Sequence, residues 1–296
     1  MMKKLSQARV ATFALLGVTV VWGSTFIVIK DSIVRQPEAD FLATRFSIAA
    51  ILLICARPQA LRAISKQTVL RGILLGGALG GGYLAQTFGL RTASAAVSGF
   101  ITGLFVVFTP IIGGWILKRP VGRWPWIAVV FATIGLALLS LKGWSIGGGE
   151  GLTILCALGF ALHIVGLGEW SMHENAYSFA IVQLLVVSLI CWIAALTDGY
   201  QAPPDRGVWG ALLLTSVAGT AVAFVVQTWT QALVAPTRAA VIMTMEPVFS
   251  GVFAVYIGHE HMTFKMLTGG ALVLIAMYLV ELGPKKAWQD VTRANH

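Results

Sequence analysis

SFAIVQLLVVSLIC, residues 178–191, contains no charged side chain and lies within a longer uncharged run over residues 177–197. An α-helix needs roughly 20 mostly apolar residues to cross the hydrocarbon core of a bilayer. The whole chain shares this character, with 57% hydrophobic and 11% charged residues and a mean hydropathy of +0.82. Soluble domains carry about 25% charged residues. So few charges cannot cover a water-facing surface, and we therefore predict that a lipid bilayer surrounds this chain.

Ten runs of this kind are predicted to be transmembrane helices. They cover residues 10–29, 39–56, 69–89, 95–117, 124–141, 151–169, 177–197, 208–231, 239–257 and 264–282. The segments between them are short, as in packed helical bundles. No clean small-residue cleavage site ends the first run, so we expect an uncleaved helix there. The predicted fold class is all-α, that of a polytopic membrane protein with ten transmembrane helices.

The chain contains a weak internal repeat. DFLATRFSIAAILL (40–53) aligns with the stretch at 178–191 at an offset of 138 residues, which pairs Arg45 with Gln183. Further along, QTF (86–88) matches QTW (227–229) at an offset of 141 residues. Because these matches keep the same order in both halves, we predict that the repeat unit contains five helices.

An odd number of helices places the second unit upside down relative to the first. We therefore predict two inverted five-helix repeats, residues 1–143 and 144–296, joined flexibly by KGWSIGGGEG (142–151). Secondary transporters commonly have this architecture, with the substrate site near the midplane between the repeats.

The charge pattern predicts an orientation. More lysines and arginines lie in segments on the side of the N-terminus than on the opposite side, which favours cytoplasmic termini in a cell (inner or plasma) membrane. Nucleic acid is not a predicted partner, because the basic residues form no stripe with interleaved aromatic residues. The three cysteines lack metal-ligand spacing, and no nucleotide-binding motif is present. We therefore predict no metal, no cofactor and no ATP-driven transport by this chain alone.

In MTMEPVFSG (243–251), the carboxylate Glu246 lies inside an apolar run and precedes Pro247. A carboxylate near the bilayer centre costs roughly 2.5–3.5 kcal/mol on insertion scales, so it usually faces protein or a wet cavity. It could bond to backbone donors, meet a substrate amine or bind a proton. Pro247, and Pro110 in the fourth predicted helix, weaken their helices. Each is a packing kink or a gating hinge.

Polar and aromatic residues near the predicted midplane indicate an apolar cavity with a few polar points, typical of small-molecule sites. Gln86 and Gln227 occupy equivalent positions in the two repeats. His163 is either a satisfied core histidine or a proton-sensitive cavity residue. The predicted substrate cavity contains Trp22, Thr25, Tyr83, Gln86, Phe100, His163, Gln227, Trp229, Met243 and Glu246.

Two other features allow more than one interpretation. Arg45 is expected to snorkel to the interface or to pair with Glu38 or Asp40. Gly72, Gly76 and Gly80 recur every four residues, a spacing that lets helix backbones approach closely in lipid. They form either a packing surface or a surface along which helices slide.

Several segments together resemble the EamA family of the drug/metabolite transporter superfamily. They are WGSTFIVIK (22–30), DFLATRFSIAA (40–50), TASAAVSGFITGLFVVFTPIIG (92–113), PTRAAVIMTMEPVFSG (236–251) and GHEHMTFKMLTGGALVLIAMYLVE (258–281). The resemblance implies ten transmembrane helices, a central cavity between two halves and export of small metabolites.

By position, the resemblance makes Glu246 and Pro247 the family's Glu-Pro pair, and Arg45 its helix 2 arginine. Gly258, His259 and Glu260 match its Gly-x-Glu, whereas LKRP (117–120) in the first half lacks the glutamate. The layout is also similar to that of the family's aromatic and hydrophobic amino-acid exporters.

We therefore predict a transporter, not an enzyme, that exports amino acids or related amphipathic metabolites by alternating access. Its predicted partners are the small-molecule substrate and the lipid bilayer, and protons are a candidate coupling ion. The sequence leaves the oligomeric state open. The main alternative is multidrug or cationic-compound efflux. An intramembrane enzyme would need a paired acid and base, and a membrane scaffold or sensor would carry no flux.

Overall fold

The computed structural model describes residues 2–118, 122–142, 145–171, 174–233 and 242–282. The first half contains α1 (Met2–Ser32), α2 (Glu38–Ala56), η1 (Pro58–Ala63), α3 (Lys66–Leu90), α4 (Ala95–Thr102), α5 (Phe105–Ile116) and α6 (Arg123–Ser140). The second half contains α7 (Gly148–Trp170), α8 (Ala176–Ala195), α9 (Arg206–Leu213), η3 (Leu214–Val222), α10 (Ala223–Leu233), α12 (Met245–Tyr256) and α13 (Phe264–Leu282). The start of the predicted span 239–257 and part of LKRP (117–120) lie outside the described residues.

Seven helical segments in the described part of the chain are long and apolar enough to cross a membrane. They are Arg9–Ser32, Glu38–Ala56, Lys66–Leu90, Ala95–Ile116, Gly148–Trp170, Ala176–Ala195 and Arg206–Thr230. Arg123–Leu139 and Phe264–Leu279 are shorter apolar helices. The protein is therefore a polytopic helical membrane protein.

The predicted flexible joint at 142–151 contains regular structure. The strands β1 (Leu141–Lys142) and β2 (Ser145–Ile146) pair antiparallel, and α7 begins two residues later at Gly148. This two-residue ladder departs from the predicted all-α content, but it is too short to change the fold class.

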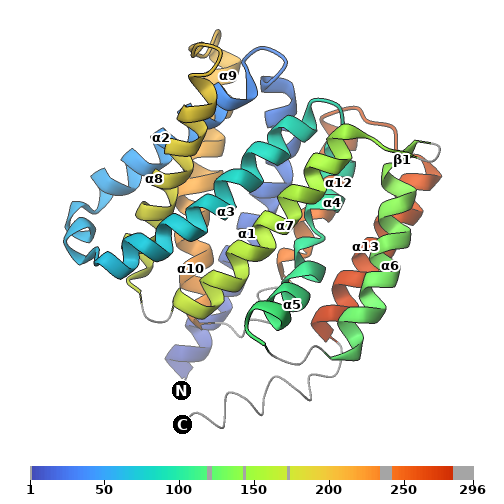
Figure 1. Ribbon diagram of the computed structural model, residues 1–296, viewed down its shortest axis with the longest axis horizontal. Helices are drawn as coiled ribbons and strands as arrows, with labels where there is room; N and C mark the ends of the chain where they lie inside the picture. Colours follow the sequence, from blue (N-terminus) through green and yellow to red (C-terminus); the bar gives the residue numbers. More distant parts are fainter. Residues whose placement is uncertain (1, 119–121, 143–144, 172–173, 234–241, 283–296) are drawn as a thin grey trace.

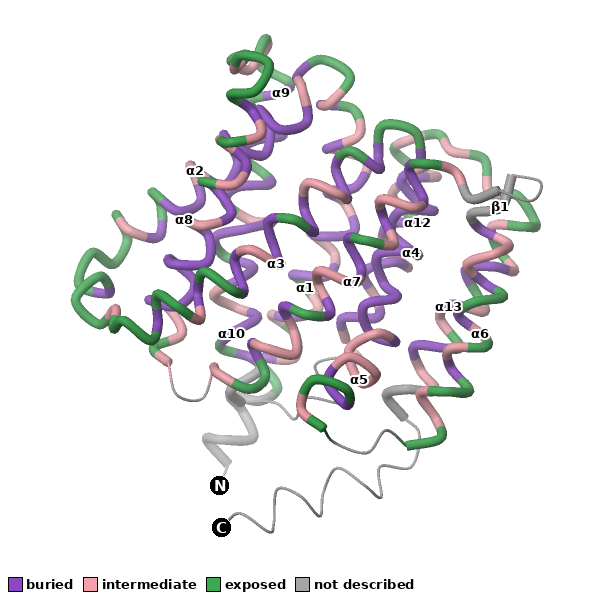
Figure 2. The backbone as a smooth tube through the Cα atoms, viewed as in Figure 1, coloured by how far each residue is buried: buried purple, intermediate pink, exposed green. Residues whose placement is uncertain are grey.

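Apolar side chains cover the outer faces of the peripheral helices. On α8, Leu185, Leu189 and Ile193 lie one turn apart and are 44%, 60% and 62% exposed. Trp126 and Val130 repeat this spacing on α6. Figure 2 shows the buried residues gathered in the middle of the molecule and the exposed ones along its sides. Such wide apolar exposure is rare in soluble monomers and suits contact with lipid.

Polar residues cap several helices where the sequence makes them begin. Asn175 accepts backbone N–H groups at the start of α8, and Asp205 accepts the Val208 N–H at the start of α9. These bonds satisfy donors that have no partner inside the helix. The Val208 N–H and the adjacent Arg35 guanidinium hold the pKa of the Asp205 carboxyl below its usual value.

The helices pack closely where glycines meet a neighbour. α3 lies between α7 and α8, and α6 lies along α13 (Figure 1). A Cβ atom added to Gly76 of α3 would lie 2.7 Å from the Val186 Cβ and 2.9 Å from the Gln183 carbonyl oxygen, both on α8. A Cβ atom added to Gly72 would likewise contact Val182 of α8, and one added to Gly80 would contact Ile190 of α8. The predicted glycine surface is thus the contact between α3 and α8.

Gly76→Ala is expected to destabilise the protein, whereas Gly77→Ala is not. Overpacking a tight contact costs typically 1–3 kcal/mol. Gly77 has no atom within 4 Å of its added Cβ, and alanine there gains helix propensity of about 1 kcal/mol. Thermal unfolding of the two detergent-solubilised variants measures the difference. Equal melting temperatures would contradict this packing.

Three apolar segments leave regular α-helix geometry near the middle of the molecule. α4 ends at Thr102, and Gly103 and Leu104 form a turn before α5. A second turn, at Thr244, precedes α12 and lies 141 residues after Gly103, the offset at which the two glutamine motifs align. The third is η3, a π-helix, a geometry found frequently at functional sites.

Candidate functional site

A cavity in the middle of the bundle brings together most of the predicted site residues. Its volume is about 50 Å³, and a single water needs roughly 10–15 Å³. Eight predicted residues line it: Trp22, Thr25, Tyr83, Gln86, His163, Gln227, Met243 and Glu246. The rest of the lining is Phe26, Arg45, Leu79, Phe105, Phe160, Ile164 and Phe224. The cavity is thus mostly apolar, with two charged side chains and two amides.

Glu246 enters this cavity from the first turn of α12. The turn at Thr244 ends the preceding helical residues, and Pro247 follows Glu246 in the first turn of α12. The Glu246 side chain is buried, at 7% exposure. Within the described part of the chain, no hydrogen bond or ion pair reaches its carboxylate. The interpretation that nearby backbone donors satisfy it therefore finds no support among these residues.

Arg45 also faces the cavity, and the sequence interpretation of this residue is wrong. It neither snorkels nor pairs with an acid of its own helix, because it is 1% exposed and sits on the inner face of α2. Asp40 instead accepts the Gln201 N–H, and Glu38 lies 3.3 Å from Arg91. The Arg45 Nε donates to the Thr220 hydroxyl in η3 at 3.0 Å.

The neutral polar groups of the cavity are held by specific neighbours. The His163 Nε2 and the Gln183 Oε1 are 2.7 Å apart, and the Gln183 Nε2 donates to the Phe179 carbonyl. The Gln86 Nε2 donates to the Thr102 hydroxyl, the last residue of α4. His163 is therefore both a satisfied buried histidine and a cavity residue. Its part in proton handling stays a prediction.

Two predicted cavity residues lie elsewhere. Trp229 is 39% exposed. It follows Gln227 by two residues, about 200° around the helix, so it points away from the cavity. Phe100 is buried against α13, where a Cβ on Gly270 would lie 2.8 Å from the ring. The absence of a side chain at Gly270 leaves the space that this ring fills.

The two candidate hinge prolines lie in the helices that follow the two interruptions. Pro110 lies inside α5, which begins just after the Gly103–Leu104 turn. Pro247 is buried where α12 crosses α4, and a Cβ on Gly103 would lie 3.2 Å from its ring. Pro247 therefore lies in the turn of helix that follows an interruption, whereas Pro110 lies further along its helix, six residues after Leu104.

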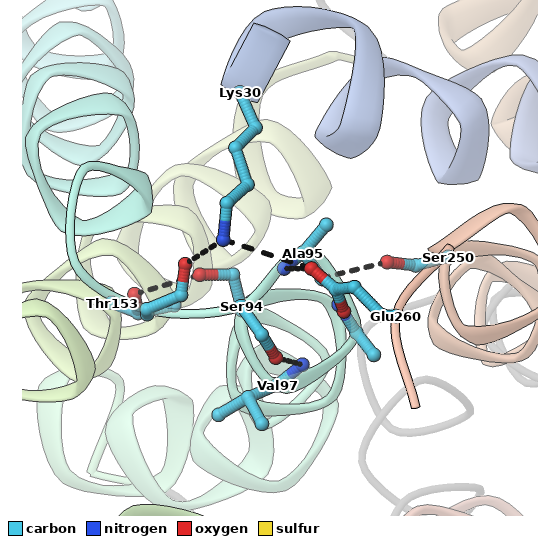
Figure 3. Close-up of polar contacts among 10 residues, drawn as sticks. Lys30, Ser94, Ala95, Val97, Thr153, Ser250 and Glu260 are labelled. Atoms are coloured by element: carbon cyan, nitrogen blue, oxygen red, sulfur yellow. Dashed lines mark hydrogen bonds and ion pairs between the residues drawn. The ribbon is translucent and has the colours of Figure 1, made fainter. Parts of the chain in front are cut away.

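Glu260 fastens the loop after α12 to the start of α4 (Figure 3). Its Oε1 accepts the Ala95 N–H at 2.8 Å, and its Oε2 accepts the Ala96 N–H at 3.2 Å. Lys30 of α1 lies 3.6 Å from the Glu260 Oε1 and donates to the Ala93 carbonyl. A carboxylate at a helix N-terminus satisfies free N–H groups and suits the helix dipole. The GHEH loop (258–261) thus joins three helices.

Glu260→Ala is expected to lower the free energy of unfolding by about 1–2 kcal/mol, because the Ala95 and Ala96 N–H groups at the start of α4 lose their charged acceptor. His261→Ala changes an exposed residue of the same loop and serves as the control. Thermal unfolding of both variants in detergent measures the effect. An unchanged melting temperature for Glu260→Ala would show that this contact does not stabilise the bundle.

A polytopic helical membrane protein with a mostly apolar cavity between its helices, lined by a few polar and charged groups, is the class that this fold and site define. The model of the EamA-like transporter family matches residues 9–141 and again residues 147–282. The chain therefore belongs to the EamA-like transporter family.

The relatives agree with this assignment. A protein described as an uncharacterized transporter from Archaeoglobus fulgidus is 30% identical over 266 residues, which cover 90% of this chain and 83% of that protein. The uncharacterized transporter YoaV of Bacillus subtilis is 22% identical, over 90% of this chain and 94% of its own. One solved crystal structure shares the fold, with a TM-score of 0.66 and 17% identity over 93% of this chain and 97% of that one.

Proposed function

We propose that this transporter exports amino acids or related small amphipathic metabolites across the cell membrane. The observation that carries this proposal is Glu246, a buried carboxylate in a mostly apolar cavity, with no bonding partner in the described part of the chain. The ammonium group of a substrate would pair with this carboxylate, and the amides of Gln86 and Gln227 could form hydrogen bonds with the substrate. The phenylalanines of the cavity suit an apolar substrate side chain.

The proposed architecture is that of ten spans in two inverted repeats, residues 1–143 and 144–296. Helices that occupy the same place in the two repeats pack on each other: α2 on α8, α4 on α12 and α6 on α13. Such pairs are expected beside a two-fold axis that relates inverted repeats. The helix interruptions at Gly103 and Thr244, 141 residues apart, also support the proposal.

Alternating access would open this cavity to one side at a time. With a volume of about 50 Å³, it is much smaller than the roughly 300–1,000 Å³ of a typical ligand pocket. Substrate entry therefore requires the surrounding helices to move. The interruptions at Gly103 and Thr244, and the prolines Pro110 and Pro247 in the helices that follow them, are the places where the helices would bend. The charge pattern of the sequence supports cytoplasmic termini.

Efflux of labelled amino acids from proteoliposomes tests this function, with and without a pH gradient. We expect saturable flux of neutral, hydrophobic amino acids. Accumulation against their own gradient, only when protons can move, would indicate antiport. Gradient-independent flux would indicate facilitated export. Absence of flux for every amino acid in the panel would contradict the proposal.

The second candidate is efflux of cationic compounds, which Glu246 would attract. Arg45 in the same cavity argues against it, because like charges placed together cost several kcal/mol. A quaternary amine in the same efflux panel separates the two functions. Amine flux without amino-acid flux would favour the second candidate.

A further inference from the structure

Among the described residues, Arg45 is the largest fully buried side chain, and several neighbours contact its guanidinium group. Its Nε donates to the Thr220 Oγ1 at 3.0 Å, and the same hydroxyl donates to the Thr215 carbonyl at 2.8 Å inside η3. The guanidinium carbon lies 5.1 Å from the centre of the Tyr83 ring and 5.1 Å from that of Phe46. These contacts fix the orientation of the guanidinium group within the cavity.

One end of this group has no hydrogen-bond partner among the described residues. The Nη1 of Arg45 is buried and makes no hydrogen bond in the described part of the chain. No carboxylate among the described residues lies within 4 Å of the group, since Glu38 and Asp40, the acids of α2, bond elsewhere. An arginine side chain keeps its charge in proteins. A buried charge without a counterion is strongly unfavourable.

The equivalent position in the second half lacks this charge. Gln183, which aligns with Arg45, bonds to His163 and to its own helix. Among the described lining residues, the cation Arg45 and the carboxylate Glu246 are therefore the two charged groups, and no ion pair joins them. Such an arrangement offers one site for an anion and one for a cation.

We propose that Arg45 binds the carboxylate of the substrate and thereby selects zwitterionic amino acids over amines. This inference rests on the proposed export of amino acids and adds the group that recognises their acidic end. The free Nη1 donor would form a charge-assisted hydrogen bond to a carboxylate oxygen. Glu246 would hold the ammonium group, and the aromatic lining would hold the side chain.

The test measures efflux of labelled leucine from proteoliposomes that also contain one of three competitors. The competitors are unlabelled leucine, leucine amide, which lacks the carboxylate, and N-acetylleucine, which lacks the ammonium group. For the wild-type protein, we expect leucine to compete at least tenfold better than either analogue. If leucine amide inhibited efflux by the wild-type protein as well as leucine does, the proposal would be overturned by the wild-type result alone.

Arg45→Gln is expected to raise the KM for leucine at least tenfold and to abolish the preference for leucine over its amide. Arg45→Lys keeps the positive charge and should retain part of the preference. It provides a second test of the proposal in case the Arg45→Gln protein fails to fold. Arg57→Gln, at the exposed end of the same helix, should leave both quantities unchanged. A folded Arg45→Gln protein with unchanged KM and preference would overturn the role of Arg45 while amino-acid export stands. Absence of leucine flux in the wild type, with flux of a quaternary amine, would overturn the proposed function itself and this role with it.

Discussion

Glu246→Gln is expected to reduce amino-acid export about 10- to 100-fold while leaving the protein folded. The substitution keeps the size and shape of the side chain and removes the charge proposed to meet the substrate ammonium. A hydrogen bond to a charged group contributes about 1.5–3 kcal/mol, and each 1.4 kcal/mol is tenfold in affinity. Initial efflux rates at matched amounts of reconstituted protein measure the effect.

The same substitution should leave the melting temperature unchanged or raise it. Burying an unpaired charge is unfavourable, and Glu246 has no bonding partner in the described chain, so a neutral amide relieves that cost. Glu169→Gln removes an exposed carboxylate near the end of α7 and is the matched control. Normal export by Glu246→Gln, or a large loss of stability, would show that the carboxylate has a structural role.

Gly23→Leu is expected to abolish most export and to destabilise the protein by about 1–3 kcal/mol or more. A Cβ on Gly23 would lie 2.6 Å from the Phe249 Cβ, 2.8 Å from the Ser250 nitrogen and 3.0 Å from the Glu246 carbonyl oxygen. Because backbone atoms of α12 are among these neighbours, a rotamer change cannot relieve the clash. The leucine would separate α1 from α12 and displace Glu246 from the cavity.

Gly17→Leu is the control for this prediction. Gly17 lies on the same helix, and no atom lies within 4 Å of its added Cβ. Thermal unfolding and efflux should therefore match those of the wild type. If Gly23→Leu and Gly17→Leu behaved alike in both assays, the close contact between α1 and α12 would not exist in the folded protein.

The long apolar runs made the membrane class predictable, because helix length and hydropathy are properties of each segment alone. Many of the cavity residues could also be predicted from the sequence. Gln86 and Gln227, for example, align in the repeat, and both line the cavity. Polar side chains within apolar runs are unfavourable in lipid, so they usually face the protein interior. Most of the site prediction was based on this constraint.

The side chains of Trp229 and Arg45 were misplaced because their positions depend on how each helix is rotated about its axis in the bundle. The pattern of a single sequence does not reveal that rotation. Trp229 looked as suitable as Gln227, yet the two residues lie on opposite faces of α10. Arg45 looked interfacial because it is about six residues from the start of its helix. Its true position follows from η3, where Thr220 and the small Gly219 leave room for the guanidinium. No sequence pattern predicted that π-helix.

Protection of a cavity cysteine by substrate tests the central claim most directly. Gln227→Cys and Trp229→Cys would each be made in a Cys55→Ala background, because Cys55 is exposed and the other two cysteines are buried. The rate of modification by a small membrane-permeant maleimide would be measured with and without saturating leucine. We predict that leucine slows modification at position 227 and leaves position 229 unaffected. Equal rates at position 227 with and without a transported amino acid would contradict the claim that this cavity is the substrate site.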